Sequence, residues 1–143
     1  MSGAGYEEFL ARHLDHPWAS DGPYWNLRGN GGLLSTARDM FRWHVALDGD
    51  EVLDRQAKRK LFEPHVLEEP GGSSYYGYGW VIVRADNRKV AWHNGGNDWS
   101  YGELTRLLDD GAMVFWVTNQ SGGWDVDELG PELTQGVAER VLG

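Results

Sequence analysis

The spacing of hydrophobic residues changes along this chain, from a helical period to strict alternation. In the first half, apolar side chains recur at helical spacing, which predicts short amphipathic helices over residues 5–14, between Thr36 and Gly49, and over residues 54–62. Thr36 and Asp39 form an approximate capping box that marks the start of the second helix, and Gly49 supplies its stop. The first half is therefore expected to contribute helices.

From Tyr75 onward the pattern alternates between two faces, which is typical of β-strands. It predicts an antiparallel meander of about four strands, over residues 75–84, 88–94, 100–108 and 112–119. The run from Ala112 to Val117 is apolar on both faces. Because a strand of that kind is buried from both sides, we expect it at the centre of the sheet, with helices above and below.

A last helical stripe closes the chain. Its members are Val126, Leu129, Leu133, Val137 and Val141. The stripe predicts a C-terminal helix packed on the sheet. Short helices, a meander and a closing helix make an α+β fold, and the length of 143 residues fits a single domain over residues 1–143.

Composition excludes several classes of function. A net charge of -9 would repel a phosphate backbone, so nucleic-acid binding is not expected. No run approaches the roughly 20 apolar residues of a membrane span, and no signal peptide is visible, so we expect a soluble protein, cytoplasmic by default, with its compartment unknown. Only His13 and His16 share a short spacing, so no metal site and no cofactor are expected.

Four separated patterns carry a family resemblance. They are Arg28-Gly29-Asn30-Gly31-Gly32-Leu33-Leu34-Ser35-Thr36-Ala37-Arg38-Asp39-Met40, Tyr76-Gly77-Tyr78-Gly79-Trp80, His93-Asn94-Gly95-Gly96-Asn97 and Val117-Thr118-Asn119. In this order they resemble the serine beta-lactamase-like family, which includes penicillin-binding proteins, class C beta-lactamases and related esterases. The resemblance covers nearly the whole chain, but it matches only the C-terminal half of that family's catalytic domain.

The resemblance implies three catalytic motifs, and the sequence convincingly holds one. The family's nucleophile lies in S-x-x-K, yet no Ser here has a Lys three residues later; Ser35 leads to Arg38, for example. Tyr24-Trp25-Asn26 fits the second motif, Y-x-N, but its place just before the glycine-rich segment favours coincidence. The third motif, K/H-x-G on a strand, is matched from His93 onward.

By analogy with the family, the segment from His93 to Trp99 would hold a substrate. Gly96 N–H would be the donor to the oxyanion, and His93 would orient the reacting group or a substrate carboxylate. Gly95 would give the substrate clearance, and Asn94, Asn97 and Trp99 would complete the binding residues. The alternative for His93 is a half-buried imidazole satisfied by a neighbour, and the two interpretations stay open.

Three hypotheses about function follow. The chain is part of a hydrolase or transpeptidase-like enzyme, inactive alone, whose Ser and Lys come from a second chain. Alternatively it is a binding module for a beta-lactam, peptide, glycan or ester-type ligand that self-associates through an exposed sheet edge. A third hypothesis is a degenerate or shortened domain without activity. The sequence does not separate them.

Overall fold

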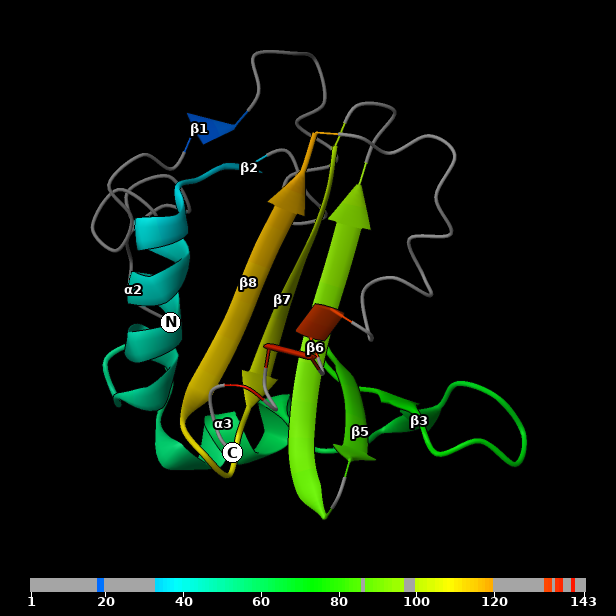
Figure 1. The fold of residues 1–143 in the computed structure, drawn as a ribbon. Helices are drawn as coiled ribbons and strands as arrows, with labels where there is room; N and C mark the ends of the chain where they lie inside the picture. Colours follow the sequence, from blue (N-terminus) through cyan, green and yellow to red (C-terminus); the bar gives the residue numbers. More distant parts are fainter. Residues whose placement is uncertain are drawn as a thin grey trace. The chain divides into compact units, whose positions relative to one another are not determined.

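A computed structural model shows the fold (Figure 1). It describes residues 18–19, 33–85, 87–96, 100–119, 133–134, 136–137 and 140. The chain divides into two compact units, Met1–Val52 and Leu53–Gly143, which are described separately below.

In the described residues of the first unit, two paired two-residue strands precede a helix. Strand β1 (Trp18–Ala19) lies antiparallel to β2 (Leu33–Leu34), and helix α2 (Ala37–Asp48) follows. The predicted capping box at the start of α2 is confirmed, because Asp39 N donates to Thr36 Oγ1 at 3.2 Å and Thr36 N donates to Asp39 Oδ2 at 3.2 Å. The helix predicted over residues 5–14 lies outside the described residues.

The second unit begins with helix α3 (Arg55–Leu61), whose N-cap is Asp54 as predicted. A six-stranded antiparallel sheet follows, in which the strands lie in the order of the sequence. The strands are β3 (Val66–Leu67), β4 (Tyr75–Tyr76), β5 (Val81–Ala85), β6 (Arg88–Gly96), β7 (Tyr101–Leu107) and β8 (Ala112–Thr118). The α+β class is confirmed.

The prediction of about four strands is not confirmed, because the sheet has six. The strand predicted over residues 75–84 is interrupted after Tyr76. There Gly77 N donates to the Trp80 carbonyl oxygen at 2.8 Å, and Gly79 takes a φ of +78°, a conformation that glycine adopts without steric cost. The alternation continues across this turn, so the pattern alone does not reveal it. Strand β3, with two residues, is too short to show a period.

The predicted central position of residues 112–117 is wrong. Strand β8 is the last strand in the sheet order, and most of its side chains are half-buried. Its neighbour β7 is buried on both faces instead. Sequence reasoning missed this because β7 carries polar residues, among them Thr105 and Arg106, each only 2% exposed. Because of these polar residues, the sequence of β7 does not show an apolar run, although the strand is buried and pairs with both β6 and β8.

The cross-strand register sorts the side chains of the sheet into two faces. One face carries Leu104 and Arg106, and the Arg106 guanidinium lies 5.3 Å from the centre of the Phe62 ring, just after α3. The other carries Glu103 and Thr105, and Thr134 Oγ1 donates to Glu103 Oε1 at 2.7 Å. Each face is thus covered at one point by another part of the second unit.

The predicted C-terminal helix is described only in part. Residues 133–134, 136–137 and 140 are helical, and the remainder of the predicted stripe lies outside the described residues, so a packed closing helix stays a prediction. Among the described residues, no helix is long and apolar enough to cross a membrane.

Candidate functional site

The segment His93–Gly96 forms the last part of β6, where that strand loses one neighbour. Pairing between β5 and β6 stops at Val81 and Trp92. Pairing with β7 continues to the end, from His93 opposite Leu104 to Gly96 opposite Tyr101 (Figure 1). Among the described strands, therefore, only β7 pairs with this segment. An edge of this kind can accept hydrogen bonds from, and donate them to, an extended ligand.

The side chain of His93 is exposed, and it lies on the sheet face that also carries Leu104. Within the described part of the chain, no hydrogen bond or ion pair involves the His93 imidazole. A half-buried imidazole satisfied by a neighbour is therefore not what the described residues show. Asn94 is half-buried and faces the opposite side, directly across from Glu103.

The two glycines of the segment differ in the space around them. A Cβ atom built on Gly95 meets no heavy atom of the described residues within 4 Å. The same atom on Gly96 would lie 2.8 Å from Tyr101 Cδ2 and 2.9 Å from the Ser100 carbonyl oxygen. Gly95 therefore leaves open space on the face of His93, whereas Gly96 allows β6 and the start of β7 to approach closely.

Gly102, which sequence reasoning did not single out, lies beside Gly95 on the neighbouring strand. It is the cross-strand partner of Gly95, and a Cβ there would lie 2.9 Å from Val117 Cγ1. The two glycines form a glycine floor that is open at Gly95, next to exposed His93, and is covered at Gly102 by the side chain of Val117, which is 68% exposed. A glycine inside a strand pattern was the available signal, because it marks a close approach of backbone or ligand.

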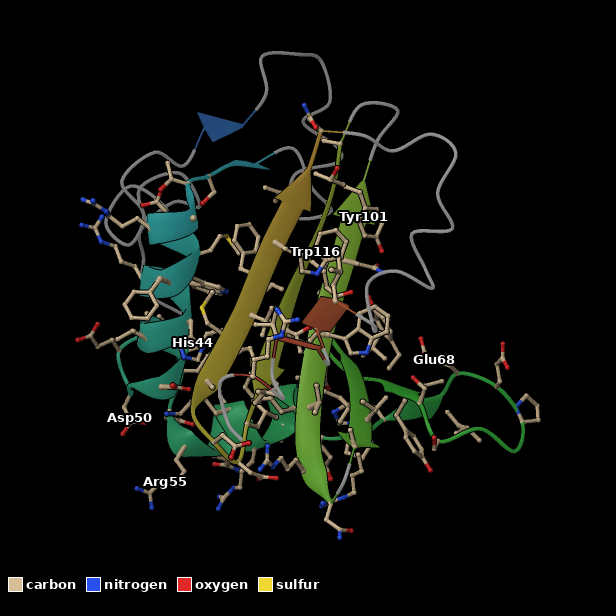
Figure 2. All side chains as sticks on the ribbon, in the orientation of Figure 1. His44, Asp50, Arg55, Glu68, Tyr101 and Trp116 are labelled. Atoms are coloured by element: carbon tan, nitrogen blue, oxygen red, sulfur yellow. The ribbon has the colours of Figure 1, made fainter. Side chains whose placement is uncertain are left out.

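The opposite face supports this floor with packed and hydrogen-bonded side chains. The rings of Tyr101 and Trp116 lie 5.5 Å apart between centroids, tilted by 34°, and they appear next to each other in Figure 2. Glu103 is 5% exposed, and its Oε1 accepts from Thr105 Oγ1 at 2.8 Å and from Thr134 Oγ1 at 2.7 Å. A buried carboxylate held by two hydroxyls fixes the strand next to β6.

Several predicted residues cannot be placed. Asn97, Trp99 and the Tyr24–Asn26 match lie outside the described residues. The described part of the chain contains no group of three or more His, Asp or Glu side chains arranged to hold a metal ion. The described part of the site consequently consists of the exposed His93 side chain, a glycine floor and the backbone edge of β6, with Asn94 on the opposite face. A backbone N–H group at such an edge can donate to an acyl oxygen and polarise the acyl group.

Known proteins share this arrangement of elements. Among solved structures, the penicillin-binding protein from Bacillus halodurans is 29% identical, with a TM-score of 0.55 over 69% of this chain and 30% of its own. The D-amino acid amidase from Ochrobactrum anthropi SV3 complexed with D-phenylalanine has a TM-score of 0.60 over 76% of this chain and 37% of its own. At 19% identity, the likeness to the amidase shows the fold alone.

The sequence comparisons agree with the structural ones. Penicillin-binding protein 4* of Bacillus subtilis (strain 168) is 26% identical over 95 residues, which make up 66% of this chain. The chain spans only 21% of the length of that relative. The family model described as Beta-lactamase matches residues 3–138, nearly the full sequence. The chain therefore belongs to the beta-lactamase family, the serine hydrolase-like group that also includes penicillin-binding proteins.

Proposed function

We propose that this chain supplies the substrate-binding strand of a serine hydrolase or transpeptidase-like site, while the Ser and Lys of S-x-x-K come from outside its 143 residues. The observation that carries the proposal is the end of β6, where His93–Gly96 pair on one side only and Gly95 faces open space. The chain alone then binds the substrate without acylation.

Each residue of the segment has a part in this proposal. The Gly96 N–H donates to the oxyanion that forms when the acyl carbonyl is attacked, and loss of one such donor costs about 2.7 to 4 kcal/mol of transition-state stabilisation in other enzymes. His93 orients the reacting group or a substrate carboxylate from the open face. Asn97 and Trp99 hold the remainder of the substrate, whereas the Asn94 side chain, on the opposite face of the sheet, takes no part in this contact. The likeness to penicillin-binding proteins favours a beta-lactam, peptide or ester as its chemical class.

The absence of a nucleophile rests on sequence. Lys occurs at positions 58, 60 and 89, and none of these follows a Ser by three residues. Because the chain spans 21% of one relative and 30% of another, the proposal assigns S-x-x-K to the remaining part of the fold, carried by a second polypeptide or by a longer form of this protein.

Binding without chemistry provides the test. Benzylpenicillin is titrated into the ¹⁵N-labelled chain while amide chemical shifts are recorded. We expect saturable shifts at Gly95 and Gly96, at least tenfold weaker binding in His93→Ala, and unchanged binding in His65→Ala. His65 is the matched control, because it is also exposed but lies before β3, away from the β6 end. Shifts that avoid β6, or equal binding by both variants, would contradict the proposal.

A second function, self-association through β8, is favoured by one observation. No described strand pairs with the outer side of β8, although its residues are apolar on both faces. Unpaired strand edges of this kind template pairing with another chain. Val117→Lys should therefore raise the dimer dissociation constant at least tenfold in light scattering after size exclusion. Val66→Lys is the control, since Val66 is 64% exposed on the strand at the other end of the sheet order. A monomer at millimolar concentration would exclude this function.

A further inference from the structure

A hollow of about 400 Å³ lies at the β3–β4 end of the sheet, away from the β6 segment in the strand order. We call it the aromatic hollow. Its lining residues are His65, Val66, Tyr76, Gly77 and Tyr78. The hollow is shallow and open, so a ligand would lie against its lining residues without being enclosed. No role in the beta-lactamase-like site requires this surface.

Exposure of large hydrophobic side chains singles out the same place. Within residues 66–78 the described chain exposes Val66, Leu67, Tyr75, Tyr76 and Tyr78. Val66 and Tyr78 are each 64% exposed. Monomeric proteins rarely expose apolar side chains in such clusters unless something binds there. Three of the exposed residues, Val66, Tyr76 and Tyr78, also line the hollow, so the exposed cluster and the hollow form one candidate binding surface.

The walls of the aromatic hollow are held in place before any ligand arrives. His65 Nε2 lies 2.9 Å from the Lys60 carbonyl oxygen, so this nitrogen donates, and the His65 ring meets the Tyr78 ring edge-on with centroids 4.8 Å apart. The turn below is closed by the bond from Gly77 N to the Trp80 carbonyl oxygen at 2.8 Å. A preformed site avoids much of the entropy cost of ordering side chains on binding.

The absence of charged side chains from the lining of the aromatic hollow favours an uncharged ligand. None of the five lining residues carries a carboxylate, ammonium or guanidinium group. A charged ligand would therefore find no counter-ion in the lining. The walls instead offer aromatic rings and the hydroxyls of Tyr76 and Tyr78, and the backbone carbonyl oxygens of Leu61 and Glu63 lie 3.2 and 3.1 Å from the Cβ position of Gly77. The matching ligand has an apolar face and uncharged polar groups around its edge.

We propose that the aromatic hollow binds a neutral saccharide. A pyranose ring lays its C–H face on the exposed tyrosine rings, while its hydroxyls exchange hydrogen bonds with the phenol groups and the nearby carbonyl oxygens. A purely apolar ligand would leave those polar groups without partners, which costs free energy. Because the hollow is shallow and formed by few residues, we expect a dissociation constant in the millimolar range.

The test titrates cellotetraose into the ¹⁵N-labelled chain and follows the amide signals of Gly77 and Gly79. We expect saturable shifts there and none at Gly95. Tyr76→Ala and Tyr78→Ala should each weaken binding at least tenfold. Tyr75→Ala is the matched control, because Tyr75 adjoins Tyr76 on β4 and has nearly the same exposure, 36% against 39%, but does not line the hollow. Binding by this control variant should equal that of the parent chain.

Three competing ligands complete the experiment. Tetragalacturonate tests a charged saccharide, indole tests a purely apolar ligand, and dilution of the chain without ligand tests a second copy. Weaker binding of the first two, and shifts that do not depend on protein concentration, would support the proposal. It would be overturned by the absence of cellotetraose shifts up to 50 mM, by tighter binding of tetragalacturonate or indole, or by equal weakening in Tyr75→Ala. None of these results depends on the beta-lactamase-like site.

Discussion

The two halves of β6 differ in the number of neighbouring strands with which they pair. Val90–Trp92 pair with both β5 and β7, and there Val90 and Ala91 are buried. His93–Gly96 have only β7 beside them among the described strands, and Gly95 faces open space. Packing therefore dictates the residues of the first half, while the second half is free to meet a ligand. The buried half of β6 thus fixes the position of the strand in the core, and the other half places its backbone at the edge of the sheet.

The largest expected effect lies on β5, directly beside the paired half of β6. Ile82 is buried and sits directly across from Ala91, so Ile82→Ala removes core volume beside a position that cannot fill it. The free energy of unfolding should fall by about 2 to 5 kcal/mol. Urea denaturation followed by tryptophan fluorescence measures the loss. A fall below about 0.5 kcal/mol would show that this half is not the anchor.

The two glycines of the unpaired half give a matched comparison. In Gly96→Ala the new methyl group would collide with the Tyr101 ring and the Ser100 carbonyl oxygen, whereas in Gly95→Ala it enters open space. Overpacking typically costs about 1 to 3 kcal/mol, so only Gly96→Ala should lose stability on that scale. The same denaturation series measures both. An equal loss of unfolding free energy in both variants would mean that the space beside Gly95 is occupied by other atoms.

A smaller effect is expected behind the site. Thr134→Val removes one of the two hydroxyls that donate to Glu103 Oε1. Since Thr105 still donates, the loss should stay near the value of one hydrogen bond, about 0.5 to 1.5 kcal/mol. The matched control is Thr105→Val, which removes the other donor to Glu103 Oε1 and should cost a similar amount. If Thr134→Val left the free energy of unfolding unchanged, the hydrogen bond from Thr134 would not contribute to holding β7 in place.

The smallest effect on stability belongs to His93. Its side chain is exposed and makes no described hydrogen bond, so His93→Ala should change the free energy of unfolding by no more than about 0.5 kcal/mol. The same variant should nevertheless lose ligand binding, as proposed above. Denaturation and titration of one protein sample measure the two quantities together. A marked loss of stability would assign His93 to the fold instead of the site.

Local patterns predicted more of this fold than long-range ones did. The Thr36–Asp39 capping box and the Asp54 cap were found because each depends on residues only three positions apart. The order of the strands was harder, because it depends on which strands meet in space. Apolar β8 was therefore placed at the centre of the sheet, although β7, with its polar Thr105, is the enclosed strand.

In the candidate site, too, local motifs were predicted from the sequence and cross-strand neighbours were not. The segment from His93 to Gly96 was visible as a motif, and its position on a strand end was expected. Gly102 and Glu103 were missed, because their significance comes from pairing with Gly95 and Asn94 across the sheet. Cross-strand neighbours are set by register, which a single sequence specifies only weakly where strands carry glycine.

The most direct test of the account is the intact mass of the purified chain after incubation with benzylpenicillin or a fluorophosphonate. A chain that holds the substrate strand but no acylated serine keeps its original mass under conditions in which an active penicillin-binding protein is labelled completely. A mass increase equal to one molecule of either reagent, mapped to a serine of this chain, would contradict the account.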